Sequence, residues 1–196
     1  MASYTEITTQ PTVEPLELDE LKEYLRVGSG EIDDDNDLRA LITVARKHVE
    51  NYTNRAFMSQ TRTLRMPCFP PLSDHFYLDG TPVQSITSIT YYDTGGTQET
   101  LDSSKYQLIK GPPDRIELKY NESWPSTRSD RDLIEVIYVC GESSHDDVDP
   151  VIKHAMKIFC QIEWDELSEK KEASKNITLK SLMDSLRIGD DWHGVG

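Results

Sequence analysis

The chain has 196 residues, of which 36% are hydrophobic and 29% charged, and it carries a net charge of -14. This length suffices for one domain with a buried core, and no stretch approaches the roughly 18 apolar residues of a membrane span, so we expect a soluble globular protein. The excess of carboxylates argues against tight binding of nucleic acid, which needs Lys and Arg against the phosphates.

The first predicted elements are a flexible arm and two helices. Residues 1–15 contain neither a basic start nor an apolar run, so we expect no signal peptide and a flexible N-terminal arm. Leucines at helical spacing predict a helix over Leu18–Val27, which Gly28 and the residues after it would end. A second apolar stripe predicts a longer amphipathic helix from about residue 36 to 54, so that the two form a helical hairpin.

Residues 58–141 predict β-structure, because they hold most of the prolines and several short β-prone runs between turn residues. The runs are Ser59–Met66, Phe76–Leu78, Val83–Asp93, Thr97–Leu101, Tyr106–Lys110, Arg115–Tyr120 and Leu133–Cys140. The last run is apolar on both faces, which predicts a central strand. Alternation is poor in Val83–Asp93, so its facing stays open, and Asp93 to Gly96 predicts a hairpin turn.

The C-terminal part predicts a third helix and an arm. Asp149 and Pro150 are typical of an N-cap and a first helical residue. The apolar positions of this helix spread more widely than one stripe, which leaves apolar surface for the β-rich run or for a neighbouring subunit. After Trp164 the chain is highly charged, and a short amphipathic segment follows that either folds back or docks on a partner. Its apolar residues are Leu179, Leu182, Met183 and Leu186.

These elements predict an α+β fold built on a helical bundle core, with two N-terminal helices and one long C-terminal helix. The core comprises residues 16–57 and 142–168, and a β-rich insert at residues 58–141 interrupts it. A flexible N-terminal arm, residues 1–15, and a C-terminal arm, residues 169–196, flank this core.

An acidic cluster is the sharpest motif for chemistry. Its aspartates are Asp33, Asp34, Asp35 and Asp37, and three of them have the alternate spacing of a calcium loop. Such a loop also needs glycine at its sixth position and glutamate at its twelfth, where this chain has Leu38 and Val44. The cluster is therefore interpreted as the start of a helix, whose dipole favours acidic residues.

No catalytic or metal-binding pattern stands out. Cys68, Cys140 and Cys160 form no CxxC pair, and Cys160 lies among apolar helix residues, which predicts a packing role. The nearest metal candidate, His145 with Asp146 and Asp147, is more typical of a solvated turn. We therefore expect no enzyme activity, no metal and no cofactor.

The order of elements and several phrases resemble the head-to-tail connector family (adaptor, or head-completion, proteins) of long-tailed bacteriophages and gene transfer agents. The phrases include LELDELKEYLRV, DLRALITVARKHVENYTNRAF, PVQSITSITYYDTGGTQETLDSSKYQL, IEVIYVCG and DVDPVIKHAMKIFCQIEW. The resemblance covers about residues 16–166, in the family's order. The stretch after Glu166 departs from the family pattern, because it is unusually charged and lacks the usual proline-containing end.

The resemblance implies a virion protein of the neck, made in the host cytoplasm. It implies a ring of about a dozen copies beneath the portal, with double-stranded DNA passing through it. The C-terminal segment would reach the portal, and the β-rich insert would meet the next neck component, a stopper or tail-completion protein; no membrane is involved. The expected portal-binding residues are Leu179, Leu182, Met183, Leu186 and Ile188.

Two further sets of residues are assigned as hypotheses. A closed ring needs two different patches in contact, and the wide apolar face of the third helix could supply one through Val151, Met156 and Ile158. The acidic loop (Asp33, Asp34, Asp35 and Asp37) could face the ring lumen, where like charge would let DNA slide without adhering.

Three alternatives remain open. A different neck or tail-completion protein would be mostly β-structure without a capped helical hairpin at its start. A non-viral acidic interaction domain, such as an inhibitor or DNA mimic, would be a stable monomer. A small hydrolase using His145 and its acidic neighbours has the least support, because 35 carboxylates always offer some pair as acid and base.

Overall fold

The structure is a computed structural model, and it describes residues 3–28, 35–128, 133–167 and 173–188. Within these residues the chain forms eight β-strands, four α-helices and one short 3-10 helix. The chain divides into two units that are discontinuous in sequence. The β unit comprises Met1–Pro11, Ser59–Gly141 and Ile188–Gly196, and the helical unit comprises Thr12–Met58 and Glu142–Arg187.

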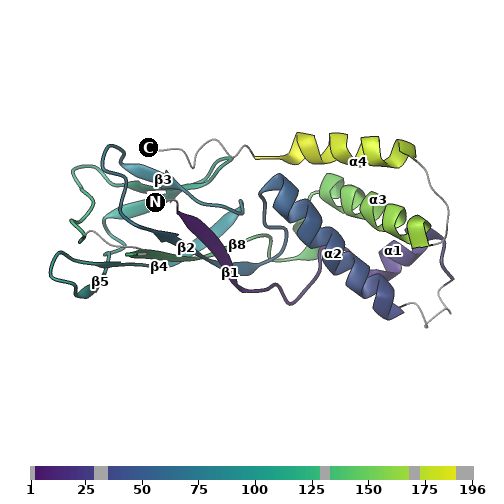
Figure 1. The fold of residues 1–196 in the computed structure, drawn as a ribbon, viewed down its shortest axis with the longest axis horizontal. Coiled ribbons are helices and arrows are strands. Elements are labelled where there is room, and N and C mark those ends of the chain that lie inside the picture. Colours follow the sequence, from purple (N-terminus) through teal and green to yellow (C-terminus); the bar gives the residue numbers. More distant parts are fainter. Residues whose placement is uncertain (1–2, 29–34, 129–132, 168–172, 189–196) are drawn as a thin grey trace. The chain divides into compact units, whose positions relative to one another are not determined.

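The β unit contains two antiparallel sheets (Figure 1). The larger sheet has, in spatial order, β1 (Tyr4–Thr9), β2 (Gln60–Met66), β8 (Ile134–Cys140), β4 (Val83–Tyr92) and β5 (Gln98–Thr100). The smaller sheet has the order β3 (His75–Tyr77), β7 (Arg115–Leu118) and β6 (Tyr106–Ile109). All neighbouring strands pair antiparallel, so hairpins and longer loops suffice to connect them.

Strand β8 is central, as its sequence predicted. It pairs with β2 on one side and with β4 on the other, from Ile134 to Cys140. Alternate side chains along it, including Ile134, Val136 and Tyr138, are fully buried, while those between them are half-buried. A strand that is at least half-buried on both faces and paired on both edges can carry apolar residues on both faces, which explains why Ile137 and Val139 are apolar too, while Glu135 pairs with Arg65.

The pairing of strand β4 explains why polar and apolar residues alternate poorly in its sequence. Its pairing with β8 shifts register between Val83 and Ser85, and again between Ile86 and Ser88. Each shift inserts an extra residue and turns the following side chains to the other face, so no simple alternation survives in the sequence. The predicted hairpin turn follows β4, and Gly96 takes a φ of 85° there while its N–H donates to the carbonyl of Asp93.

The helical unit consists of α1 (Leu18–Leu25), α2 (Asp35–Thr53), α3 (Pro150–Leu167) and α4 (Ala173–Leu186), seen together in Figure 1. A 3-10 turn, His145–Asp147, precedes α3. One apolar cluster draws residues from all four helices. Its buried members include Leu21, Leu38, Ile42, Val49, Ile152, Met156, Leu179 and Met183. No helix of the described residues is long and apolar enough to cross a membrane.

The helix ends follow local rules. The Asp149 carboxylate accepts a 2.8 Å bond from the N–H of Val151, which confirms the predicted N-cap of α3. Helix α1 ends at Leu25, earlier than predicted, because Arg26 adopts the left-handed conformation with a φ of 59°. The N–H of Val27 then closes the end on the carbonyl of Lys22 at 3.0 Å.

The predicted fold class is wrong. The described chain is β-rich, with two antiparallel sheets and four short helices, and it is not a helical bundle core with one long C-terminal helix. The runs within residues 58–141 pair into sheets that have their own buried residues, including Leu64, Ile89 and Val136. They are therefore more than an insert in a helical core. Toward the C-terminus there are two helices, because α3 ends at Leu167 and α4 begins at Ala173.

The first strand lies inside the predicted N-terminal arm. Tyr4–Thr9 pairs with β2, with a register shift between Ile7 and Thr9, and most of its side chains are exposed. An edge strand of this kind buries little, so it needs no apolar alternation. Its only local signal is the β-prone residues Tyr, Ile and Thr.

Candidate functional site

The predicted portal-binding residues are buried in this chain. Leu179, Met183 and Leu186 belong to the core of the helical unit, and Leu182 packs partly against it. Ile188 is also buried. Of the two alternatives left open for this segment, the structure shows the folded-back one, with α4 packed on α2 and α3. The portal-binding role of these residues stays a prediction.

Polar contacts reinforce the docking of α4 on α2. The hydroxyl of Tyr52 donates to the carboxylate of Asp184, and Nε of Arg55 donates to the carbonyl of Leu186 at 2.9 Å. The hydrogen bond to Asp184 raises the pKa of Tyr52 above its ordinary value. The outer face of α4 is polar apart from Ile177, which is 74% exposed.

The predicted inter-subunit residues divide into two groups. Met156 and Ile158 lie in the core of the helical unit, whereas Val151, at the start of α3, is 40% exposed. The wide apolar spread of α3 thus has an explanation within the chain, because α3 packs against α1, α2 and α4. Val44, on α2, is another exposed valine of this unit.

The acidic loop is described only in part. Asp33 and Asp34 lie outside the described residues. Asp35 is the first residue of α2 and forms an ion pair with Lys22 of α1, and Asp37 is exposed in the first turn. Carboxylates in a first turn interact favourably with the helix dipole, as expected for a helix start.

The described candidates for chemistry do not gather into a metal site. His145 lies 3.4 Å from Glu17 and 3.4 Å from Asp146. Within the described ranges, no three side chains of His, Cys, Asp or Glu come together in a way that could hold a metal ion. Cys160 is buried, and burial raises the pKa of its thiol to about 12. That the chain is not an enzyme stays a prediction.

A buried ionic cluster was not predicted from the sequence. Arg46 is 2% exposed and donates from Nε to Glu14 at 2.7 Å and from Nη1 to Glu50 at 2.9 Å. The other oxygen of the Glu50 carboxylate accepts the N–H of Phe57 at 2.8 Å. Burial lowers the pKa of Arg46, but the hydrogen bonds and charges of the two glutamates outweigh burial and raise it. The cluster ties the segment before α1 to the end of α2.

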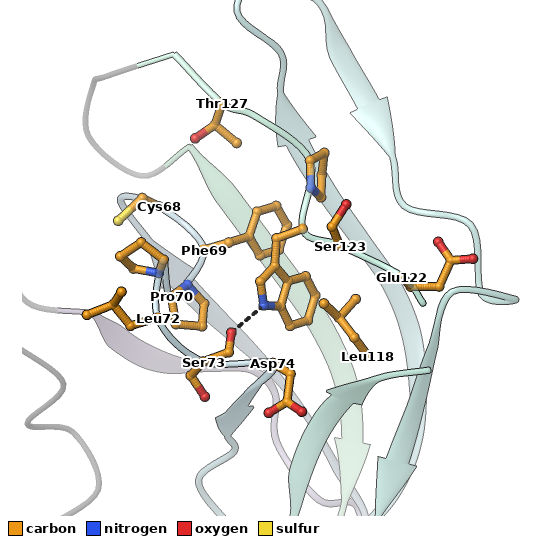
Figure 2. Close-up of a pocket in the computed structure, with 13 residues that line it drawn as sticks. Cys68, Phe69, Pro70, Leu72, Ser73, Asp74, Leu118, Glu122, Ser123 and Thr127 are labelled. Carbon is orange, nitrogen blue, oxygen red and sulfur yellow. Dashed lines mark hydrogen bonds between the residues drawn. The ribbon is translucent and has the colours of Figure 1, made fainter. Parts of the chain in front are cut away.

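A hollow in the β unit is lined by residues that include Trp124 (Figure 2). We call it the Trp124 groove, and its volume is about 530 Å³. It lies between two irregular segments, the one that follows β2 and the one that follows β7. Its lining residues are Cys68, Phe69, Pro70, Pro71, Leu72, Ser73, Asp74, Leu118, Glu122, Ser123, Trp124, Pro125 and Thr127.

Trp124 is fixed on several sides. Its ring stacks on Phe69 with 4.8 Å between centroids and 5° between planes, and Phe76 lies 5.4 Å away. The indole N–H donates to the carbonyl of Ser73 at 2.9 Å, drawn as the dashed line in Figure 2. Since Phe69 and Phe76 are themselves buried, the floor of the groove is already ordered before any ligand arrives.

The rim of the groove combines exposed apolar surface with negative charge. Leu72 is 92% exposed, so a large aliphatic side chain is accessible beside the aromatic floor. The lining includes two carboxylates, Asp74 and Glu122, and no Lys or Arg. A hydrogen bond with His75 lowers the pKa of Asp74, so this carboxylate stays charged to lower pH.

Comparison with known proteins finds similarity in structure. No protein-family model matches the chain, and no curated protein matches it. A chain in a structure described as the virion of a native gene transfer agent (GTA) particle aligns with a TM-score of 0.77 at 19% identity, over 94% of this chain and 95% of that one. A chain in the neck of an empty GTA particle, computed with C6 symmetry, aligns equally well over 95% and 96%.

A third match comes from the neck of a native GTA particle computed with C12 symmetry, with a TM-score of 0.72, 18% identity and 95% and 96% coverage. The chain therefore has the fold of these GTA particle chains over nearly its whole length. At such low identity the similarity shows the fold alone.

Proposed function

We propose that the chain is a structural component of the neck of a phage-like virion. The observation that carries the proposal is the alignment, over 94–96% of both chains, with chains of GTA particles, including two neck structures. The sequence phrases quoted above lead to the same class of particle. A purely structural role also agrees with the scattered histidines and the buried thiol of Cys160.

More specifically, the chain would be the head-tail connector subunit. Copies would form a ring beneath the portal, through which double-stranded DNA passes, and would link the portal to a stopper or tail-completion protein. The C6 and C12 symmetries of the related neck structures support a ring for this chain too. Val151, the one predicted inter-subunit residue with substantial exposure, is the candidate for a contact between copies.

The test is native mass spectrometry and negative-stain imaging of the full chain, alone and mixed with the portal protein of the same genome. We expect a ring, or a portal complex of ring stoichiometry. Val151→Glu should prevent this assembly, because it buries a charge at the contact, whereas Val151→Thr keeps the side-chain shape and should assemble. A monomer without affinity for the portal would exclude the connector and favour an acidic interaction domain.

The portal contact has a structural requirement. Leu179, Met183 and Leu186 face the chain's own core, so they can reach a portal only if α4 leaves α2 and α3. Deleting residues 176–196 would remove core side chains as well as the predicted contact. The deletion therefore tests portal binding only if the shortened chain keeps its circular dichroism spectrum, and portal binding that persists would contradict the assignment.

A further inference from the structure

The Trp124 groove has the features of a binding site for another protein. Its aromatic floor is pre-ordered by the stack of Phe69 on Trp124 and by the bond from the indole to Ser73. Its wall is rich in proline, and Leu72 stands almost fully exposed at its edge. Rigid aromatic floors of this kind lose little entropy when a ligand packs on them, and tryptophan is enriched among the residues that dominate binding.

The polar groups of the groove select the chemistry of the ligand. The indole N–H is already donated to Ser73, so it cannot serve a carbonyl of an incoming peptide. What the rim offers are the acceptor oxygens of Asp74 and Glu122, whose side chains are 71% and 37% exposed. Such a rim repels phosphates and attracts Lys or Arg.

The neighbouring cations leave this acidity available. Lys105 approaches Glu122 only to 4.0 Å, and both side chains are exposed, so the pair is weak. Asp74 interacts with His75 beside it through Oδ1 at 2.9 Å, and the positive charge of Arg115 also acts on it, although Arg115 is paired with Glu117 at 2.9 Å. A carboxylate has a second oxygen and several lone pairs, so an arginine of a partner can still be accommodated.

We propose that the Trp124 groove binds a segment of another protein that presents an apolar side chain flanked by Arg or Lys. The apolar side chain would pack on Trp124 and Leu72, and the flanking cations would pair with Asp74 and Glu122. This goes beyond the proposed neck role and does not depend on it, because the binding can be measured on the isolated chain whether or not a ring forms.

The experiment uses the full chain and short fluorescent peptides. The probe carries a leucine flanked by arginines, and its twin carries the same leucine flanked by glutamates. Fluorescence anisotropy, with peptide held at trace level and protein titrated to about 1 mM, should give saturable binding of the arginine peptide. The glutamate twin should bind at least about tenfold more weakly, because the rim repels it.

Matched variants locate the binding. Leu72→Ser should weaken binding of the arginine peptide about fivefold or more. Tyr120→Ser should leave binding unchanged, because Tyr120, although equally exposed at 93%, lies outside the lining of the groove. Asp74→Asn and Glu122→Gln should each weaken binding of the arginine peptide about two- to fivefold. Glu99→Gln, on the exposed strand β5, is the charge control and should bind as the parent chain does.

Four results would overturn the proposal. They are the absence of saturable binding, equal binding of the glutamate twin, unchanged binding by Leu72→Ser, and unchanged binding by both rim variants. Sedimentation tests the remaining alternative, that a second copy of the chain occupies the groove. If the chain self-associates, and Leu72→Ser abolishes the self-association while no peptide binds, the groove is a contact between copies and the assignment to another protein is wrong.

Discussion

Arg46 is enclosed by two carboxylates in the helical unit, and its neighbour Glu50 is only 3% exposed. A buried pair of this kind adds little stability compared with apolar residues of the same shape, because desolvation offsets the attraction. Removing one partner is different, since the other charge is left in an apolar surrounding. The stability of the helical unit therefore depends on Arg46 and Glu50 both being present.

We predict that Arg46→Ala lowers the free energy of unfolding by about 3–5 kcal/mol, because it leaves Glu50 charged and buried. Arg39→Ala, at an exposed position of the same helix, should change it by less than about 0.5 kcal/mol. Urea denaturation followed by circular dichroism measures both. The double change Arg46→Met with Glu50→Gln should recover part of the loss, and no recovery would contradict the proposed cause.

At the scale of elements, α4 is an integral part of the helical core. Its buried residues lie on one face, at positions 179, 183 and 186, and its opposite face carries the exposed Ile177. An apolar face of this size in water would favour aggregation, so covering it against α2 and α3 stabilises the folded chain. The same contacts set the free-energy cost of releasing α4.

We predict that Met183→Ala destabilises the chain by about 2–5 kcal/mol, through lost burial and the cavity that it leaves. Ile177→Ala removes an aliphatic side chain from the same helix but should change stability by less than about 0.5 kcal/mol. Thermal and urea unfolding compare the two. Equal effects would mean that α4 is not packed as described.

Sequence patterns predicted individual elements better than their assembly. The apolar run of β8 and the Asp149 cap of α3 depend on neighbours along the chain or on a simple period, so they could be predicted. The edge strand β1 buries too little to leave a pattern, and the register shifts of β4 erase its alternation. The fold class failed because pairing between distant strands determines it.

The Trp124 groove was missed for the same reason. Phe69 and Trp124 are far apart in sequence and meet only in the folded β unit. The available signal was compositional, since the segments Pro67–Pro71 and Trp124–Pro125 concentrate proline and aromatic residues. Four of the five residues expected at the portal, Leu179, Leu182, Met183 and Leu186, form an amphipathic stripe, but a stripe does not reveal whether it faces the same chain or a partner.

At the scale of the whole molecule, most of the β unit is inserted between the halves of the helical unit. The two ends of this insertion meet, because Met58 and Glu142 form a bridge and the N–H of Glu142 donates to the carbonyl of Phe57 at 3.2 Å. Adjacent ends of this kind are typical of insertions that a host fold tolerates.

We predict that residues 12–58 and 142–187, joined by a short Gly-Ser linker in place of residues 59–141, fold as a helical protein. The contacts of the core are all retained, and the linker spans adjacent ends. Circular dichroism should show a cooperative thermal transition. The same shortened chain with Arg46→Ala is the control and should unfold at a lower temperature, and the absence of any transition would show that the helical unit needs the β unit.

The insertion also sets the order in which the chain can fold during translation. About a hundred residues separate the end of α2 at Thr53 from the start of α3 at Pro150, which takes on the order of 5–20 s at ribosomal speed. During that interval α3 and α4, which cover the apolar stripe of α2, have yet to be made. The helical core can therefore close only after α3 and α4 have been made, and until then Leu38 and Ile42 lack the side chains that cover them.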